Sequence, residues 1–319
     1  MKRRNLLMLS LLSTFGALLP TKILAQASDS LKTWSSQDVS KGFEVFAKTG
    51  KMPTELSQWL RDAEIQKREP YQVFDNVWWV GITWVSSWLI KTSDGLVLID
   101  TLHEPFVDRL IKNIETLGFK LSDIKYVLMT HGHFDHVGGY YKLKPLMPNA
   151  PFAMTQKGWQ EAFENSQASE GKPNAWKMLQ KTDLIVKDGD EILCGDSRFV
   201  VLETPGHTWG TASYLYEAKW GDRRYRCVTV GGLGLNAIES KSQIEAYISS
   251  IKRLADKRLN VEVDLTAHPF STGLTEKIPL IQKARAPEAH PLVDRNAYLE
   301  QLQKLLSNAE ALLQSGKYR

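Results

Sequence analysis

Four side chains that can bind a metal lie within six residues near the middle of the chain. Residues 131–136 read His-Gly-His-Phe-Asp-His. Neutral imidazoles and an ionised carboxylate are ligands that Zn²⁺ prefers. An apolar, β-prone run over residues 124–130 precedes them, and a helix-like segment containing Tyr140 and Leu143 follows. We therefore predict a strand, a ligand-bearing loop and a helix.

Short β-rich runs separated by turn residues lie before this motif. They cover residues 71–74, 77–81, 87–91 and 96–100 and predict an antiparallel meander. Apolar residues at helical spacing over residues 107–117 predict an amphipathic helix that Gly118 ends. Before the meander, residues 28–66 are polar, and we expect one short helix there, over residues 54–60.

The second half of the chain repeats this order of strands and helices. We predict helical stretches near Trp159 and Trp176, then a second meander over residues 184–186, 191–193 and 199–202. Further strands are predicted at 212–216, 225–230 and 261–266, and helices at 244–254 and 294–313. His207 and His268 each follow a predicted strand, where a loop histidine is more often structural than functional.

The motif over residues 131–136 resembles the H-x-H-x-D-H signature of the metallo-β-lactamase-fold hydrolases. The resemblance is clearest over residues 71–268. It implies an α/β fold, a four-layer αββα sandwich in which two sheets pack face to face with helices outside. It also places His207 and His268 at the later ligand positions of the family.

The resemblance implies two Zn²⁺ ions as cofactors. The first zinc would take His131, His133 and His207, with an open fourth position, and the second would take Asp135, His136 and His268. This ligand set is similar to that of the third subclass of class B (zinc) β-lactamases. The second subclass lacks the first motif histidine, and the first subclass uses a cysteine at the second zinc.

This resemblance implies that a metal-bound hydroxide opens the β-lactam amide, with Asp135 as the catalytic residue that orients the nucleophile. One alternative is a related hydrolase of another ester, lactone or amide, and a less favoured one is a non-catalytic binding module. Glyoxalase-type relatives carry a bridging aspartate where this chain has residues 231–236, which hold no carboxylate. Third-subclass β-lactamases often have serine near Gly232, and glycine there favours the alternative substrate classes.

Four further residues are candidates for supporting the metals or contacting the substrate. Asp100 ends a predicted strand and resembles the family residue that supports the metal loop, although an aspartate there also suits a helix N-cap. Trp84, Trp209 and Asn236 are candidate substrate contacts, and packing explains the two tryptophans equally well. We expect His103 at the rim of the site and a structural role for His290.

Length and composition favour three segments. The chain has 319 residues, 43% of them hydrophobic, and we predict a signal peptide over residues 1–27, an N-terminal extension over 28–70 that packs on the body, and a catalytic domain over 71–319. The formal charge of +4 comes from the first 27 residues, where every charged side chain is basic. The remainder is neutral, so we expect a small-molecule substrate and no nucleic-acid partner.

The N-terminus predicts export to the periplasm or beyond. Lys2, Arg3 and Arg4 precede an apolar stretch over residues 6–19 that is too short for a membrane anchor, and Ala-Gln-Ala over residues 25–27 fits a cleavage site. The general secretory and twin-arginine routes both remain open. Cys194 and Cys227 could pair in an oxidising compartment or stay as buried thiols. We expect a monomer.

Overall fold

The computed structural model describes residues 34–172 and 174–318. Two sheets carry all the strands of this part of the chain. The first sheet has the order β1 (Tyr71–Phe74), β2 (Val77–Trp79), β3 (Trp88–Thr92), β4 (Gly95–Ile99), β5 (Ile124–Leu128), β6 (Phe152–Thr155) and β7 (Leu184–Val186). The second has the order β12 (Val263–Asp264), β11 (Arg223–Thr229), β10 (Ala212–Trp220), β9 (Ser197–Glu203) and β8 (Glu191–Cys194).

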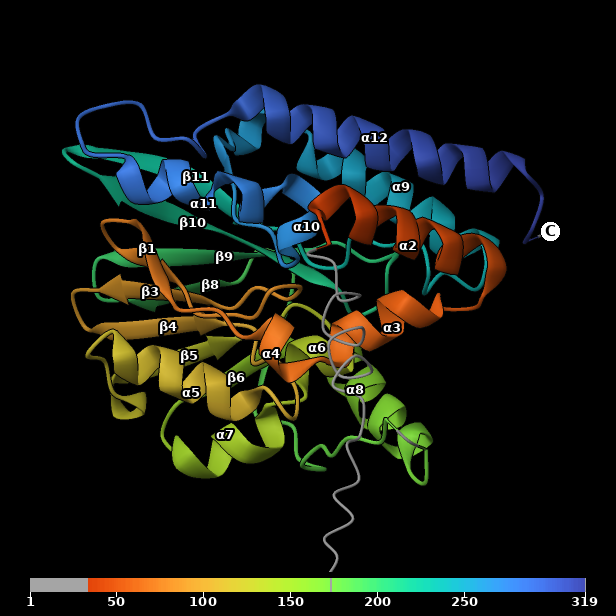
Figure 1. Cartoon of the computed structure of the whole chain (residues 1–319), viewed down its shortest axis with the longest axis horizontal. Coiled ribbons are helices and arrows are strands. Elements are labelled where there is room, and N and C mark those ends of the chain that lie inside the picture. Colours follow the sequence, from red (N-terminus) through yellow and green to blue (C-terminus); the bar gives the residue numbers. More distant parts are fainter. Residues whose placement is uncertain (1–33, 173, 319) are drawn as a thin grey trace, which may run out of the picture. The chain divides into compact units, whose positions relative to one another are not determined.

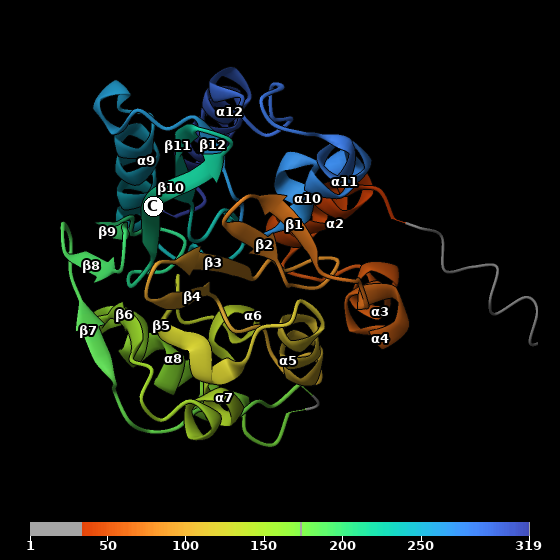
Figure 2. The ribbon, with the colours of Figure 1, turned by 90° about the vertical axis from the view of Figure 1, so that its left-hand side faces the viewer.

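Helices cover the outer face of each sheet (Figure 2). Beneath the first sheet lie α5 (Val107–Thr116), α6 (Phe134–Val137), α7 (Tyr140–Leu146) and α8 (Gln156–Ser169). Above the second lie α9 (Lys241–Leu254) and α12 (Arg295–Gln314). The remaining helices are α2 (Ser36–Thr49), α3 (Thr54–Arg61), α4 (Ala63–Gln66), α10 (Pro269–Thr272), α11 (Leu274–Lys283) and the 3₁₀ turns η1 (Leu121–Asp123) and η2 (Lys257–Leu259).

Strand β4 shows why the layers stack in this order. Successive side chains of a strand point to opposite faces. Leu96 and Leu98 therefore pack with the helices beneath the first sheet, whereas Val97 and Ile99 pack between the two sheets. A third apolar cluster joins the second sheet to α9 and α12. Three cores between four layers confirm the predicted αββα sandwich.

The first meander was predicted correctly, and the second was not. β1 to β4 pair antiparallel in sequence order. Residues 184–186 form β7, which pairs in parallel with β6 in the first sheet, while β8 and β9 belong to the second sheet. The prediction missed β6, because a four-residue strand directly after Pro151 carries too little periodicity to distinguish it from a loop.

The N-terminal region has more regular structure than the sequence predicted. Helix α2 was missed, although a capping box between Ser35 and Asp38 marks its start. Val39 on α2 and Leu56 on α3 are fully buried in the core beneath the first sheet. No helix surrounds Trp176, where a helical stretch was predicted; Trp159 does lie in a helix, α8.

Three other predictions concern the termini and the cysteines. The predicted signal peptide, residues 1–27, lies outside the described residues. None of the helices over residues 34–318 is both long and apolar enough to span a membrane. Cys194 and Cys227 are both buried and free.

Candidate metal centre

The six predicted ligands converge where strand ends of both sheets meet. β5 ends at Leu128, its following loop carries His131 and His133, and the short helix α6 carries Asp135 and His136. His207 comes from the loop between β9 and β10, and His268 directly precedes α10. Segments more than 130 residues apart in sequence thus supply one site, as the His136–His268 contact shows.

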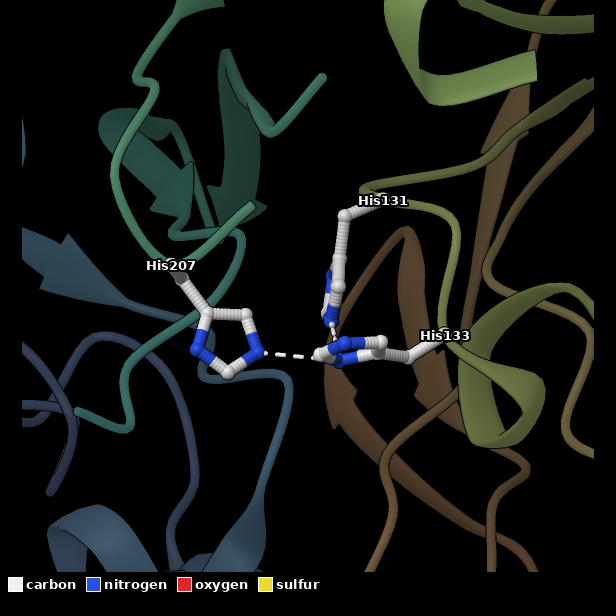
Figure 3. Close-up of side chains that lie close together, drawn as sticks. All are labelled: His131, His133 and His207. Atoms are coloured by element: carbon white, nitrogen blue, oxygen red, sulfur yellow. Dashed lines mark hydrogen bonds between the residues drawn. The ribbon is translucent and has the colours of Figure 1, made fainter. Parts of the chain in front are cut away.

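The first ligand group consists of His131, His133 and His207, whose rings point toward one another (Figure 3). His131 Nε2 lies 3.1 Å from His133 Nδ1. His207 Nε2 lies 3.0 Å from the same His133 nitrogen. His131 and His207 are buried, and His133 is partly exposed.

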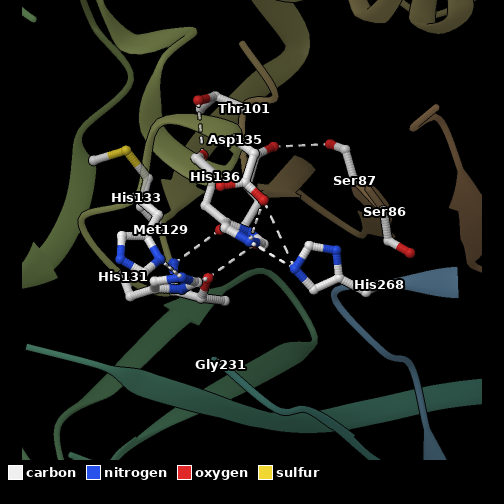
Figure 4. A network of polar contacts seen from close by, with 12 residues as sticks. Ser86, Ser87, Thr101, Met129, His131, His133, Asp135, His136, Gly231 and His268 are labelled. Atoms are coloured by element: carbon white, nitrogen blue, oxygen red, sulfur yellow. Dashed lines mark hydrogen bonds and ion pairs between the residues drawn. The ribbon is translucent and has the colours of Figure 1, made fainter. Parts of the chain in front are cut away.

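The second ligand group consists of Asp135, His136 and His268 (Figure 4). His136 Nε2 lies 3.1 Å from Asp135 Oδ2 and 3.2 Å from His268 Nε2. His268 Nε2 lies 3.7 Å from Asp135 Oδ2. Asp135 and His136 are buried, and His268 is partly exposed.

These separations fit the residues to metal ions. Ligand atoms about 2.0–2.1 Å from one tetrahedral zinc lie about 3.3 Å apart. The contacts given above run from 3.0 to 3.7 Å, so the second group matches one face of such a tetrahedron, as do the two separations given for the first group. Two triads side by side in this fold indicate a dinuclear metal site.

Asp100 lies beneath the second ligand group and orients it. Its Oδ1 accepts the Thr130 N–H at 2.8 Å, and its Oδ2 accepts the Thr130 hydroxyl at 3.0 Å. His136 Nδ1–H donates to Asp100 Oδ2 at 2.7 Å, which leaves the lone pair of His136 Nε2 for a metal. Asp100 has a φ of +63°, a left-handed conformation that aspartate tolerates better than most residues. It is therefore held beneath the metal loop rather than acting as a helix N-cap.

Backbone and hydroxyl acceptors fix three more imidazoles in the same way. The Thr130 hydroxyl donates to Asp100, so His131 Nδ1–H donates to Thr130 Oγ1 at 3.1 Å. His207 Nδ1–H donates to the Gly234 carbonyl at 2.6 Å. His268 Nδ1–H donates to the Trp84 carbonyl at 2.9 Å. Each bond turns a ring so that Nε2 faces its ligand group.

The electrostatics of the site favour cation binding. Burial lowers the pKa of four imidazoles and keeps them neutral, namely those of His131, His133, His207 and His268. The pKa falls to about 4 for His133, to about 3 for His207 and to about 4 for His268. Burial opposes ionisation of Asp135, but the neighbouring His136 outweighs it, so the pKa of Asp135 lies below its ordinary value. Burial also opposes protonation of His136, but the carboxylates of Asp135 and Asp100 outweigh it and raise the His136 pKa to about 10. A metal that binds to the second ligand group therefore displaces a proton from His136.

Two features favour glycine at position 232: a left-handed backbone conformation and the close approach of His207. Its φ is +64°, and a Cβ built there would lie 2.5 Å from His207 Cβ and 2.6 Å from His207 Cδ2. A serine at this position would therefore displace a ligand of the first group. The sequence analysis interpreted this glycine as evidence about the substrate. In the structure it makes room for the His207 side chain.

The remaining candidate residues separate into two sets. Trp84 and Asn236 line the cavity above the ligands, and so does His103, which is 8% exposed. Trp209 is 40% exposed and is not among the described residues that line this cavity; Lys157 Nζ lies 5.4 Å above its ring. His290 is buried and bonds to the Val73 carbonyl through Nε2 at 2.7 Å, a structural role.

Helix α8 connects the two loops that carry the first ligand group through Glu161 and Asn165, which the sequence analysis did not single out. Glu161 accepts the N–H groups of Trp209 and Gly210 at 2.7 and 3.0 Å. Asn165 donates to the Gly132 carbonyl at 3.2 Å. Burial raises the pKa of Glu161. A Glu-x-x-x-Asn spacing on a helix is too common to be recognised in advance as support for a metal site.

Comparison with known proteins finds the same fold and a partial match to one family model. Residues 83–219 match the model of the metallo-beta-lactamase superfamily, a span that contains five of the six ligands and ends before His268. The chain has the metallo-β-lactamase fold. It is similar to native FEZ-1 metallo-beta-lactamase from Legionella gormanii, with a TM-score of 0.70 and 24% identity over 78% of this chain and 97% of that one.

Two further relatives of this metallo-β-lactamase-fold chain differ in their described activities. BJP-1, a subclass B3 metallo-beta-lactamase of Bradyrhizobium japonicum, has a TM-score of 0.68 and 25% identity over 78% of this chain and 94% of that one. A hydroxyacylglutathione hydrolase of Bdellovibrio bacteriovorus is 29% identical over 46% of this chain. The match spans about half, 51%, of that relative's length. Together the match to the family model and the shared fold support a metal-dependent hydrolase.

Proposed function

We propose that this protein is a dinuclear zinc hydrolase that opens the amide bond of β-lactams. The observation that carries the proposal is the pair of ligand groups, His131–His133–His207 and Asp135–His136–His268, each with the spacing of a tetrahedral metal site. The proposal includes export directed by residues 1–27, with residues 71–319 as the catalytic unit and the preceding helices packed on it.

The residues of the site have different roles in the proposed hydrolysis. Bound zinc supplies Lewis acidity, which lowers the pKa of a water molecule and polarises a carbonyl group. Asp135 is the one carboxylate in the two ligand groups, and it accepts a hydrogen bond from the attacking water and orients it. Asp100, Thr130 and the Trp84 carbonyl hold the imidazoles in place, so that little reorganisation accompanies the reaction.

Another ester, lactone or thioester is the second candidate substrate. The sequence relatives favour it, because a hydroxyacylglutathione hydrolase is among them. The arrangement of the ligands favours the β-lactam, because Asp135 supplies the sole carboxylate of the two groups and residues 231–236 add none. The solved structures with the same fold include subclass B3 β-lactamases.

The test is hydrolysis of a chromogenic cephalosporin by zinc-loaded protein, with zinc content measured on the same sample. We expect turnover that a chelator abolishes and zinc restores. Asp135→Asn should retain the fold and lose at least 100-fold in kcat, in line with the removal of a positioned catalytic group. Asp94→Asn, which changes an acid at an exposed turn, is the matched control. No turnover by protein that carries two zinc ions would refute β-lactam hydrolysis and lead to thioester and lactone substrates.

A further inference from the structure

A cavity of about 800 Å³ opens over both ligand groups and is lined by all six ligands. This volume lies in the upper part of the range of about 300–1,000 Å³ seen for small-molecule sites. Residues of α2, α3 and α12, helices that supply no ligand, form its outer walls. Figure 1 shows the course of these three helices. The cavity therefore has room to bind more of a substrate than its reacting group.

The wall formed by α2 and α3 carries four large apolar side chains among the polar residues Ser40, Glu44, Ser57 and Arg61. Phe43, Phe46, Met52 and Leu60 line the cavity there, and each is only partly buried. Side chains that are half covered by the protein and still face a cavity can lose further exposed area when an apolar ligand binds. This wall therefore favours an apolar group on the substrate.

Aromatic rings continue from α2 to the second ligand group. Phe43 stacks on Phe270 with ring centroids 5.1 Å apart and planes 9° apart, and it lies 6.4 Å from the Trp84 ring. Phe270 and Trp84 lie 5.3 and 5.6 Å from the His268 ring. We call Phe43, Trp84 and Phe270 the aromatic wall. A substrate that reacts at the metals is within reach of it.

Helix α2 is held firmly in the position that forms this wall. The backbone N–H and the hydroxyl of Ser36 donate to the two carboxylate oxygens of Glu276, at 2.8 and 2.7 Å. A Cβ at Gly42 would lie 2.6 Å from Leu56 Cδ2, so glycine lets α2 approach α3 closely. The wall is thus a built part of the site.

The wall formed by α12 carries polar side chains. Gln301, Lys304 and Asn308 line the cavity at spacings of three and four residues, which places them on one face of the helix. Lys304 is exposed and forms no ion pair with the described residues, 34–172 and 174–318. The α2–α3 side of the cavity therefore carries most of its large apolar side chains, and the α12 side carries Lys304 beside Leu305.

We infer that the substrate is an amphipathic carboxylic acid derivative: an extended apolar acyl group packs on the aromatic wall, and a carboxylate faces Lys304. The inference rests on the proposed hydrolase function and specifies its substrate class. The charged end and the apolar end would orient the molecule across the cavity, with its scissile carbonyl over the ligand groups.

The test is a homologous substrate series. N-acyl derivatives of 6-aminopenicillanic acid, from acetyl to decanoyl, share one carboxylate and one β-lactam and differ only in the acyl chain. Burial of about 0.8 kcal/mol per methylene corresponds to a two- to fourfold rise in kcat/KM per methylene until the wall is covered. We expect at least a tenfold rise from acetyl to octanoyl.

Variants test whether the aromatic wall causes the rise of kcat/KM with chain length. Phe43→Ala, and Phe43→Leu as a milder change, should flatten the dependence on chain length, while Val45→Ala, which alters an exposed residue of the same helix, should retain it. Lys304→Gln should raise KM three- to tenfold for the free carboxylates and leave the KM of their methyl esters unchanged. Thermal melting confirms that each variant is folded.

The outcomes separate the inference from the function on which it rests. Hydrolysis that is independent of chain length in the parent protein would overturn the inference and leave the hydrolase function intact. If no β-lactam is hydrolysed, the inhibition constants of acetate, octanoate and decanoate against 4-nitrophenyl acetate or a thioester substrate provide the same comparison. Equal inhibition by the three acids would overturn the inference, and tighter inhibition by the longer acids that Phe43→Leu weakens would support it.

Discussion

Replacing Gly232 by serine should dislodge His207 and with it the first ligand group. The glycine has a φ of +64°, and an added Cβ would lie 2.5–2.7 Å from three carbon atoms of His207. A left-handed backbone costs a residue with a side chain about 1–2 kcal/mol. Overpacking against the imidazole costs about 1–3 kcal/mol more.

Together these terms predict that Gly232→Ser lowers the free energy of unfolding by about 2–5 kcal/mol. At about 2–4 °C of melting temperature per kcal/mol, the midpoint should fall by about 4–20 °C. Because His207 is one of three ligands in the first group, the variant should also bind one zinc less tightly and lose hydrolytic activity.

Gly118→Ser is the matched control for the backbone term. Gly118 has a φ of +82°, and its Cβ position has no atom within 4 Å. This variant should lose only the left-handed term, about 1–2 kcal/mol, and keep two zinc ions and full activity. The assays are thermal melting and zinc content by atomic absorption. A Gly232→Ser variant with two tightly bound zinc ions and parental activity would refute the reasoning.

Two further predictions concern buried carboxylates. Asp100→Asn should weaken zinc binding about 10- to 100-fold, because an amide cannot accept all three hydrogen bonds that Asp100 accepts; competition with a chromophoric chelator measures this, and unchanged affinity would contradict it. Asp264 has a buried Oδ1 without a hydrogen-bond partner among the described residues, and burial raises its pKa from 3.8 to about 7. Because the native state binds this proton more tightly than the unfolded state, stability should fall as pH rises from about 4 to 7. Asp264→Asn should abolish that fall. Thermal melting of both proteins between pH 4 and 8 measures it, and the same dependence of melting temperature on pH in the two proteins would contradict the prediction.

How much of the site could be predicted depended on how local its residues are. Four ligands lie within residues 131–136, so their spacing alone predicted metal binding. His207 and His268 follow unremarkable strands, and only the family resemblance singled them out. The structure places both beside the motif, because the loop after β9 and the segment after β12 lie at the same end of the sandwich as the loop after β5.

The sequence by itself determined the first antiparallel meander, the amphipathic helices α5, α9 and α12, and the metal motif. Each depends on periodicity or turn chemistry within a short window. Only the tertiary structure decided that β7 joins β6 in the first sheet, that Gly232 makes room for His207, and that Phe43 stacks on Phe270 beside the ligands. These contacts join residues that are distant in sequence, and their energy comes from packing and close approach, which no local pattern of residue types encodes.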